Sequence, residues 1–333
     1  MPPAPVTDFP HSEASAKRRA ISHAALIYNP AAGGGRLRKQ IHHLEDAQKI
    51  LLRGGIETTL LVTGEPGDAT EFARQCVTDG YDMVIASGGD GTVNEAVNGM
   101  ARSNLQLAVL PSGTANVLAK ELKIPWDVRR AAELIPRSRP HRIALGQISP
   151  LDGSQPDRFF LCMGGAGPDG VMVYAVDLNT KVHAGILAYW MEGFRQLVRY
   201  PFPQFRVVSD GREILASLVV VGRTRSYGGP FEITTGASLF EDFFEILALT
   251  TRSRLRYFAL LPSLWLGRLR QHADVHAWKT DLLQCEVAAG NGGAAHPVYV
   301  QVDGEPAGRL DVAFRIVPSA LTLMVPEGAR APS

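Results

Sequence analysis

Short apolar runs alternate with stretches of helical periodicity through the first half of the chain. The apolar runs predict strands at residues 24–28, 57–62, 83–86 and 107–110. The periodic stretches predict helices at residues 37–53, 69–79, 93–100 and 116–123. Such alternation builds a parallel sheet with helices on both faces, which binds ligands at the carboxyl ends of its strands. We therefore expect a doubly wound α/β domain over residues 22–143.

The second half of the chain is dominated by short strands joined by turns. Strands are expected at residues 158–163, 204–209, 214–221, 243–250, 282–288, 298–302 and 310–316. The pairs Asp210-Gly211, Asn291-Gly292 and Asp303-Gly304 are hairpin signals between them. Helices interrupt this pattern near residues 171–181, 186–199 and 254–270. The pattern predicts an all-β sandwich domain over residues 144–317.

Length, charge and cysteine usage narrow the class of protein. A chain of 333 residues exceeds the usual single core, which agrees with two domains. Its net charge of +1 gives no general attraction to nucleic acid, so no nucleic-acid partner is expected. Three separated cysteines suggest a reducing cytoplasm and no disulfide framework. Residues 1–21 are rich in Pro, Ser and Ala and predict a disordered tail without signal-peptide character.

One apolar segment raises the question of membrane contact. No run reaches the roughly 18 apolar residues of a membrane-spanning helix. Residues 257–267 are apolar, however, and arginines flank them at positions 252, 254, 256, 268 and 270. Such a segment can lie on an anionic membrane surface. The alternative is a helix with one side in the core and solvated arginines, and the sequence alone favours this alternative.

The turn after the expected strand at residues 83–86 carries three glycines around one carboxylate. Its sequence is Ser87-Gly88-Gly89-Asp90-Gly91-Thr92-Val93-Asn94-Glu95. Glycine lets the backbone approach a ligand closely, and the N-terminus of the following helix attracts an anion. Because a carboxylate repels bare phosphate, Asp90 indicates a bound metal or a proton acceptor near a reacting hydroxyl. The alternative is a tight turn with an Asp cap.

Two further Gly-containing loops follow strands of the same expected sheet. Residues 29–36 follow the first strand, and residues 111–116 follow the fourth. Carboxyl ends of parallel strands meet at one edge of the sheet, so the three loops are expected to converge there. Convergence predicts one phosphate-binding site more strongly than any single loop.

These loops and the later Asp303-Gly304-Glu305 resemble the diacylglycerol kinase catalytic-domain family, in the same order, from about residue 22 to about residue 326. That family includes bacterial soluble lipid kinases, sphingosine kinases and ceramide kinases. The resemblance implies transfer of the γ-phosphoryl group of ATP, with Mg²⁺, to a lipid hydroxyl. It also implies an NAD kinase/phosphofructokinase-like nucleotide-binding domain, a β-sandwich for the lipid, and a return of residues 318–328 to the first domain.

The resemblance also implies roles for individual residues. Asp90, Asp303 and Glu305 would share proton acceptance and Mg²⁺ binding, in a division that the sequence leaves open. Asp169 would meet the lipid headgroup. A structural Mg²⁺ would be held by the carboxylate of Asp242 and the carbonyls of Leu239 and Phe244, although Phe243 stands where relatives usually have Gly. The implied nucleotide contacts are Asn29, Pro30, Ala31, Ala32, Gly33, Thr63, Gly88, Gly89, Asp90, Gly91, Thr92, Val93, Asn94, Glu95, Gly113, Thr114 and Asn116.

Two departures from the family pattern leave the acceptor open. Val117 and Ala144 stand where bacterial diacylglycerol kinases carry Asp in a charged network near the nucleotide. A sphingoid-type lipid therefore stays open beside diacylglycerol. These departures also motivate a non-catalytic lipid- or nucleotide-binding regulator, against which the three retained carboxylates argue.

An NAD kinase is the other enzyme alternative, because it shares the Gly-Gly-Asp-Gly-Thr sequence. The Asn29-Pro30 loop and the Asp303-Gly304-Glu305 sequence favour the lipid branch instead. The expected partner is a lipid at a membrane surface that a cytoplasmic protein visits transiently. A homodimer through an edge strand stays open.

Overall fold

The structure is a computed structural model that describes residues 21–34, 37–175, 200–227, 231–288 and 296–329. The expected tail, except its last residue, and the expected helix at residues 186–199 lie outside the described residues. So do the Asn291-Gly292 turn and the later part of the expected helix at residues 171–181.

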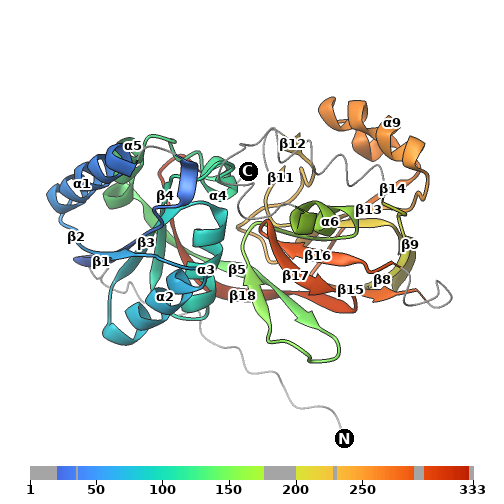
Figure 1. The fold of residues 1–333 in the computed structure, drawn as a ribbon, viewed down its shortest axis with the longest axis horizontal. Helices are drawn as coiled ribbons and strands as arrows, with labels where there is room; N and C mark the ends of the chain where they lie inside the picture. The colour runs from blue at the N-terminus through green and yellow to red at the C-terminus, as the bar shows by residue number, and fades with distance from the viewer. Residues whose placement is uncertain (1–20, 35–36, 176–199, 228–230, 289–295, 330–333) are drawn as a thin grey trace, which may run out of the picture.

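Parallel strands form the first half of the molecule. They are β1 (His23–Tyr28), β2 (Glu57–Val62), β3 (Met83–Gly88) and β4 (Gln106–Pro111), in the order β2-β1-β3-β4. The helices are α1 (Leu37–Arg53), α2 (Asp68–Asp79), α3 (Asp90–Met100), α4 (Val117–Glu121) and α5 (Val128–Leu134). Figure 1 shows α1 and α5 on one face of the sheet and α2 and α3 on the other. The predicted doubly wound α/β domain is confirmed.

The strand order places the site, because successive strands are added on one side of β1 and then, from β3 onward, on its other side. Ligands of doubly wound sheets bind at such a switch point. Every residue of β3 is buried, as expected for a central parallel strand covered on both faces. One boundary differs from expectation: α3 begins at Asp90 and not near Val93, since extended Gly89 acts as its N-cap. The acidic side chain therefore lies in the first helical turn, where the helix dipole favours negative charge.

Antiparallel strands form the second half and pack as two layers. One layer has the order β14 (Val275–Thr280), β13 (Phe244–Leu249), β10 (Leu218–Gly222), β7 (Met163–Ala166), β16 (Tyr299–Val302) and β17 (Glu305–Arg309). The other contains β5 (Arg139–Pro150), β6 (Arg158–Phe160), β18 (Val312–Val325), β15 (Leu282–Val287), β8 (Phe205–Ser209) and β9 (Arg212–Ala216). Fully buried Phe160, Phe244 and Phe314 meet between the layers, with centroid distances of 5.7 Å and 6.1 Å from Phe160 to the other two rings. The predicted β-sandwich is confirmed.

Two expected single strands are broken in the structure, because the chain changes layers within each run. Residues 158–163 split into β6 and β7, and the break falls at Leu161 and Cys162. Residues 214–221 split into β9 and β10, which belong to different layers. Between them, fully buried Ser217 donates its hydroxyl to the Thr251 carbonyl at 2.6 Å. The first run stays apolar through its break and the second is interrupted by Ser217 alone, so the hydrophobic pattern did not reveal either break.

The two halves share one continuous sheet. Strand β18 pairs with β15, and near its end Thr322 and Leu323 pair in parallel with Gln106 and Leu107 of β4. Strand β5 pairs antiparallel along nearly all of β18 (Figure 1). The domain boundaries expected after residues 143 and 317 fall inside these two strands, and the division stays a prediction. Strands β5, β14 and β17 were not expected from the sequence.

Smaller elements complete the two halves of the molecule. They are α6 (Pro168–Ala175), α9 (Arg254–Trp265), β11 (Ser226–Tyr227), β12 (Phe231–Glu232) and the short 3₁₀ turns η1 (Ala32–Gly34), η2 (Ile135–Arg137) and η3 (Leu269–Gln271). None of the helices in the described ranges is long and apolar enough to cross a bilayer.

Candidate active site

The loops after β1 and β3 are tied together at the expected edge of the sheet. The Asn29 N–H donates to the Ser87 carbonyl at 2.9 Å, and Asn29 Nδ2 donates to Thr92 Oγ1 at 3.0 Å. Asn29 Oδ1 in turn accepts from the Ala31 N–H at 2.9 Å, which closes the first loop on itself. Gly33 follows with φ of 78°, a value that favours glycine. This Asn therefore orders its own loop and joins it to the main one.

The third loop touches the main loop backbone to backbone. The Ser112 N–H donates to the Gly88 carbonyl at 3.0 Å, and a Cβ added to Gly113 would lie 2.4 Å from the Gly89 Cα. Asn116 makes two bonds to Gly113, accepting from its N–H at 3.0 Å and donating to its carbonyl at 2.8 Å. The glycines are thus required for close approach, and the structure brings all three loops together as expected. Bare backbone at a helix N-terminus is suited to phosphate.

The other residues expected to contact the nucleotide differ in exposure and in their contacts with the protein. Thr114 is exposed in the third loop, whereas Thr63 is buried at the end of β2 and its N–H donates to the Tyr28 carbonyl at 2.9 Å. Asn94 is buried, and Glu95 Oε2 accepts from the Ala69 N–H at 3.2 Å at the start of α2. The side chains of Asn94 and Glu95 are thus occupied by protein contacts, which does not favour direct contact with a nucleotide.

Asp90 lies in the first turn of α3, facing the start of α4. Its Oδ1 accepts from the Val117 N–H at 2.7 Å. Burial raises the pKa of the Asp90 carboxyl to about 6, and the charge of Asp303 adds to the rise, while hydrogen bonds from backbone amides oppose it. The contact uses the backbone of Val117, so the absence of a carboxylate at this position leaves it intact.

The contacts of Asp303 favour a structural role over the expected one. Its Oδ2 accepts from Asn94 Nδ2 at 2.8 Å and from the Leu161 N–H at 2.7 Å. Its Oδ1 accepts from the N–H groups of Cys162 at 2.8 Å and Met163 at 2.9 Å. These four bonds occupy both oxygens, and burial raises the pKa of the carboxyl against their lowering effect. The geometry makes Asp303 a link between α3 and the break of β6 and β7, and it does not favour a base or metal ligand.

Glu305 follows directly and is half-buried at the start of β17. The Asp303-Gly304 turn that carries it is a hairpin between β16 and β17, with φ of 48° and 77°. A Cβ on Gly91 would lie 3.0 Å from Glu305 Oε1, so this carboxylate borders the main phosphate loop. Asp303 is enclosed by donors, whereas the Glu305 side chain accepts no hydrogen bond within the described ranges. The structure thus brings one uncommitted carboxylate to the loop.

A cleft of about 500 Å³ lies between α3 and the ends of the sandwich hairpins, and its lining includes Pro306, the residue after Glu305. Its polar lining includes Asn94, Glu95 and Arg158, and residues Pro306 to Gly308 of β17 close one wall. Arg158 Nη2 donates to Asn94 Oδ1 at 3.0 Å, and Nη1 donates to the Pro306 carbonyl at 3.0 Å. The sequence did not single out Arg158, because nothing near it in the chain marks a site.

Asp169 lies inside the protein, only 4% exposed, in the first turn of α6. Its Oδ2 accepts from Gln301 Nε2 at 2.7 Å, and Gln301 Oε1 accepts from the Gly304 N–H at 2.9 Å. Burial raises the pKa of the Asp169 carboxyl to about 7. A Cβ on Gly165 would overlap this carboxylate, so glycine is needed there. The expected headgroup residue is therefore joined through Gln301 to the turn of Glu305. Gln301 was missed because its partners are distant in sequence.

The residues expected to hold a structural Mg²⁺ do not fit that ion. The Leu239 carbonyl accepts from Arg223 Nη2 at 2.8 Å, so a buried guanidinium already occupies it. Phe244 lies within β13, paired with Thr280 of β14. Asp242 is close enough to raise the pKa of Arg223. No group of three or more His, Cys, Asp or Glu side chains gathers for a metal in the parts of the chain that the structure describes.

Two family models match the chain one after the other. The model described as "Diacylglycerol kinase catalytic domain" matches residues 23–148, and "YegS C-terminal NAD kinase beta sandwich-like domain" matches residues 165–325. The chain belongs to the diacylglycerol kinase catalytic-domain family. As a member of this family it is an ATP-dependent lipid kinase. The words "NAD kinase" in the second description refer to the fold of the β-sandwich domain.

Individual relatives of this lipid kinase agree with the assignment. Proteins named diacylglycerol kinase from Staphylococcus aureus strains bovine RF122 / ET3-1 and MRSA252 are each 28% identical over 295 residues, covering 87% of this chain and 88% of the relative. The crystal structure of a diacylglycerol kinase from Bacillus anthracis str. Sterne aligns with a TM-score of 0.71 at 22% identity, covering 93% of this chain and 99% of that one. A second structure from that organism gives 0.75 at 21% identity, with 95% and 99% covered. The structures support the fold.

Proposed function

We propose that this lipid kinase phosphorylates the free hydroxyl of diacylglycerol, with Glu305 as the proton acceptor. The proposal rests mainly on the position of Glu305, whose carboxylate lies beside Gly91 of the phosphate loop and accepts no hydrogen bond within the described residues. The acceptor follows from the relatives named diacylglycerol kinase. Sphingoid-type lipids are the competing acceptors.

The three loops hold the nucleotide in this proposal. Backbone N–H groups at the start of α3 and in the touching glycine loops face the phosphates, where the helix dipole favours negative charge. Mg²⁺ would neutralise charge on the phosphates during transfer. Asp90 suits the ion, because oxygen ligands are preferred and a nearby cation would relieve the burial cost that raises its pKa.

Glu305 accepts the proton of the lipid hydroxyl as its oxygen attacks the γ-phosphorus. The bond from the γ-phosphorus to the bridging oxygen breaks, ADP leaves, and a phosphomonoester lipid forms. Asp303 acts as a positioning residue, since it ties the turn bearing Glu305 to α3 through Asn94. Gln301 supports the same turn from Asp169.

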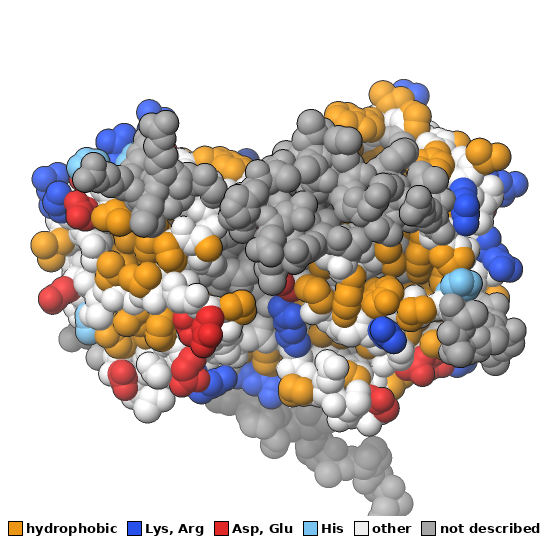
Figure 2. All heavy atoms as spheres, in the orientation of Figure 1, with side chains coloured by type: hydrophobic (Ala, Val, Ile, Leu, Met, Phe, Trp, Pro, Cys, Tyr) orange, Lys and Arg blue, Asp and Glu red, His pale blue; other side chains and the backbone are white. Residues whose placement is uncertain are grey.

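Helix α9 is the proposed membrane contact. Tyr257 and Leu260 pack into the core, whereas Leu255, Trp265 and Leu266 are 83%, 70% and 68% exposed. Figure 2 shows hydrophobic and basic side chains gathered over this helix. Three exposed arginines near its ends have no ion-pair partner among the described residues, and these are Arg252, Arg254 and Arg268. Apolar side chains beside unpaired cations suit an anionic bilayer.

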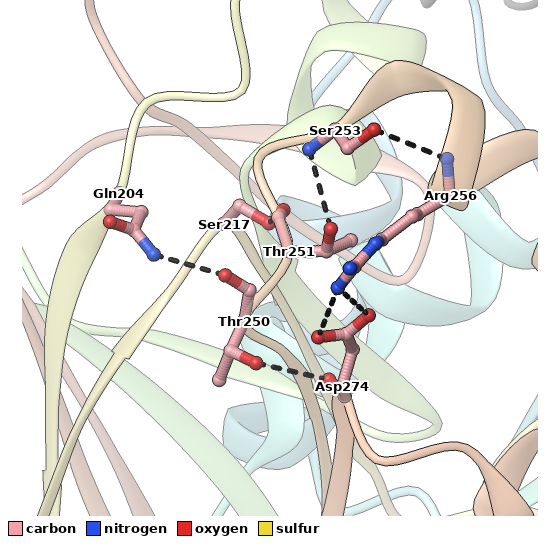
Figure 3. Close-up of polar contacts among 7 residues, drawn as sticks. All are labelled: Gln204, Ser217, Thr250, Thr251, Ser253, Arg256 and Asp274. Atoms are coloured by element: carbon pink, nitrogen blue, oxygen red, sulfur yellow. Dashed lines mark hydrogen bonds and ion pairs between the residues drawn. The ribbon is translucent and has the colours of Figure 1, made fainter.

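The start of α9 is firmly attached to the sandwich, as Figure 3 shows. Arg256 Nη1 pairs with Asp274 at 3.2 Å, and Ser253 caps the helix by accepting from the Arg256 N–H at 3.4 Å. The Thr250 hydroxyl donates to the Asp274 carbonyl at 3.4 Å, and Gln204 Nε2 donates to the Thr250 carbonyl at 3.0 Å. Contact of the exposed side chains with lipid therefore needs no unfolding of this end.

We propose on this basis a cytoplasmic protein that visits the membrane transiently. Vesicle flotation tests it: Leu255→Ser with Trp265→Ser should lower binding to vesicles containing phosphatidylglycerol by about tenfold or more, since two exposed apolar side chains are removed. Val77→Ser on α2 is the control, because Val77 is also exposed, at 40%. Equal binding of both variants would contradict the assignment of α9.

A homodimer is the proposed assembly, through an edge strand. In the two large sheets of the described residues, β2, β6, β9, β14 and β17 each pair on one side only. Sedimentation velocity across a concentration series tests this, and a monomer at all concentrations would reject it.

The central experiment is ³²P transfer from γ-labelled ATP and Mg²⁺ to micellar diacylglycerol, sphingosine, ceramide and soluble NAD. Glu305→Gln should lower kcat by about 10²–10⁴-fold while ATP binding is retained. Label in sphingosine or NAD in place of diacylglycerol would reject the proposed acceptor. Unchanged kcat in Glu305→Gln would reject Glu305 as the proton acceptor.

A further inference from the structure

Arg223 is the largest fully buried side chain among the described residues, with an exposure of 0%. It directly follows β10, and its N–H donates to the Cys162 carbonyl at 2.9 Å. Its Nη1 donates to the Glu241 carbonyl at 3.0 Å. Its Nη2 donates to the carbonyls of Leu239 at 2.8 Å and Ala144 at 3.0 Å. Three converging backbone carbonyls form a cation site, and the guanidinium fills it.

The electrostatic surroundings of Arg223 agree with a retained charge. Burial lowers the pKa of the guanidinium to about 10, and the carboxylates of Asp242 and Asp303 oppose this fall. Arginine keeps its proton in proteins, so Arg223 supplies a positive charge here. A buried charge is costly unless it is hydrogen-bonded, and here three carbonyl oxygens accept from Nη1 and Nη2, whereas the buried Nε has no hydrogen-bond partner among the described residues.

This site coincides with the position at which the family resemblance places a structural Mg²⁺. The Leu239 carbonyl belongs to both sets of ligands, and Asp242 is the carboxylate of the expected metal. The Glu241 carbonyl, and not that of Phe244, completes the arginine's contacts on this loop. A divalent cation at the same carbonyls would meet a like charge at hydrogen-bond distance, so ion and guanidinium exclude each other.

Ala144 and Val117, which stand where relatives carry Asp, agree with an exchange of the divalent ion for Arg223. Ala144 gives its carbonyl to Arg223, where bacterial relatives carry an Asp side chain in the charged network. Val117 likewise brings no carboxylate, and its N–H binds Asp90. Because two negative side chains are absent from this region, a single positive charge can balance the carboxylates that remain. The guanidinium of Arg223 carries one charge, whereas Mg²⁺ carries two.

We propose that Arg223 replaces the structural Mg²⁺ of the family, so that this chain carries its interior cation as a side chain. The cation site adjoins the active-site turn through the backbone, because the Arg223 N–H donates to the Cys162 carbonyl and the Cys162 N–H donates to Asp303. The fold around the turn of Glu305 therefore requires no divalent ion at this position. The inference concerns stability and stands apart from the proposed acceptor.

The test is thermal unfolding without nucleotide, in EDTA and in saturating Mg²⁺. Asp90→Asn is used as the background, because it removes the carboxylate proposed for the catalytic ion. We expect equal Tm in both conditions, with no stoichiometric Mg²⁺ retained after gel filtration in elemental analysis. A saturable Mg²⁺-dependent rise in Tm that vanishes on adding Asp242→Asn, or one retained Mg²⁺ per chain, would overturn the proposal.

A second arm changes the arginine itself. Arg223→Met leaves three buried carbonyls and nearby carboxylates without a cation, so Tm should fall by about 5–10 °C. Arg223→Lys keeps the charge with a different donor geometry and should lose less. Arg225→Met is the matched control, two residues away with a side chain 41% exposed. Equal Tm values for Arg223→Met and the control would also overturn the proposal.

Discussion

Asp303 is held by four hydrogen bonds, and Asp303→Asn tests whether it positions the active site or takes part in the chemistry. The amide keeps one oxygen for the N–H groups of Cys162 and Met163. Its NH₂ group then faces two donors, the Leu161 N–H and Asn94 Nδ2. Hydrogen bonds to a charged group contribute about 1.5–3 kcal/mol each, so two lost bonds amount to about 3–6 kcal/mol.

Part of this loss in stability is offset, because the amide of Asn carries no charge. Burying the charged carboxylate of Asp303 costs free energy, and this cost is what raises its pKa. We therefore expect the free energy of unfolding to fall by about 2–4 kcal/mol, which lowers Tm by about 4–8 °C for a chain of this size. Displacement of the turn that bears Glu305 should lower kcat by at most about 10²-fold.

Urea unfolding followed by tryptophan fluorescence measures the stability, and ³²P transfer measures kcat. Asp210→Asn is the matched control, since Asp210 also precedes Gly in a hairpin, with φ of 49° against 48° at Asp303. If Asp303→Asn is as stable as the control and kcat falls by more than about 10³-fold, Asp303 acts directly in the reaction and the positioning role is wrong.

Three further predictions concern the loops and their support. For Asp90, whose pKa rises from 3.8 to about 6, the folded state holds a proton that the unfolded state releases, so metal-free stability should fall by about 3 kcal/mol from well below pH 4 to well above pH 6. The difference in unfolding free energy between wild type and Asp90→Asn measures this fall, and a flat difference across that range would contradict it. Gly113→Ala should weaken ATP binding by about tenfold or more in calorimetry, because its Cβ would lie 2.4 Å from the Gly89 Cα; wild-type affinity would show that the loops need not touch. Gln301→Leu should lower stability by about 1–3 kcal/mol in urea unfolding, since Asp169 and the Gly304 N–H both lose a partner, and a more stable variant would refute that reason.

Local sequence patterns predicted the phosphate loops well, because glycine, asparagine and strand ends act over a few residues. Asn29 closes its own loop, and Gly113 and Asn116 bond within four residues of each other. The alternation of strands and helices likewise predicted the α/β half, since each element's periodicity is internal to it.

Contacts between distant segments were not predictable in this way. The donors to Asp303 come from residues about two-fifths to two-thirds of the chain away, so nothing beside Asp303 reveals that its oxygens are occupied. Arg223 follows an apolar strand, and no local pattern separates a buried arginine from a solvated one. The layer change at Ser217 was hidden for the same reason, because its partners lie on β13 and beyond.

The ribbon of β5 and β18 has a mechanical consequence. Both strands pass from one half of the molecule into the other, with one register shift between Val317 and Leu321. Unfolding of either half alone would break the hydrogen bonds between β5 and β18 in the middle of both strands. Heat should therefore unfold the chain in one calorimetric transition. Any motion of one half relative to the other must likewise bend this pair of strands. The bend should occur at the register shift, where the ladder of hydrogen bonds is interrupted.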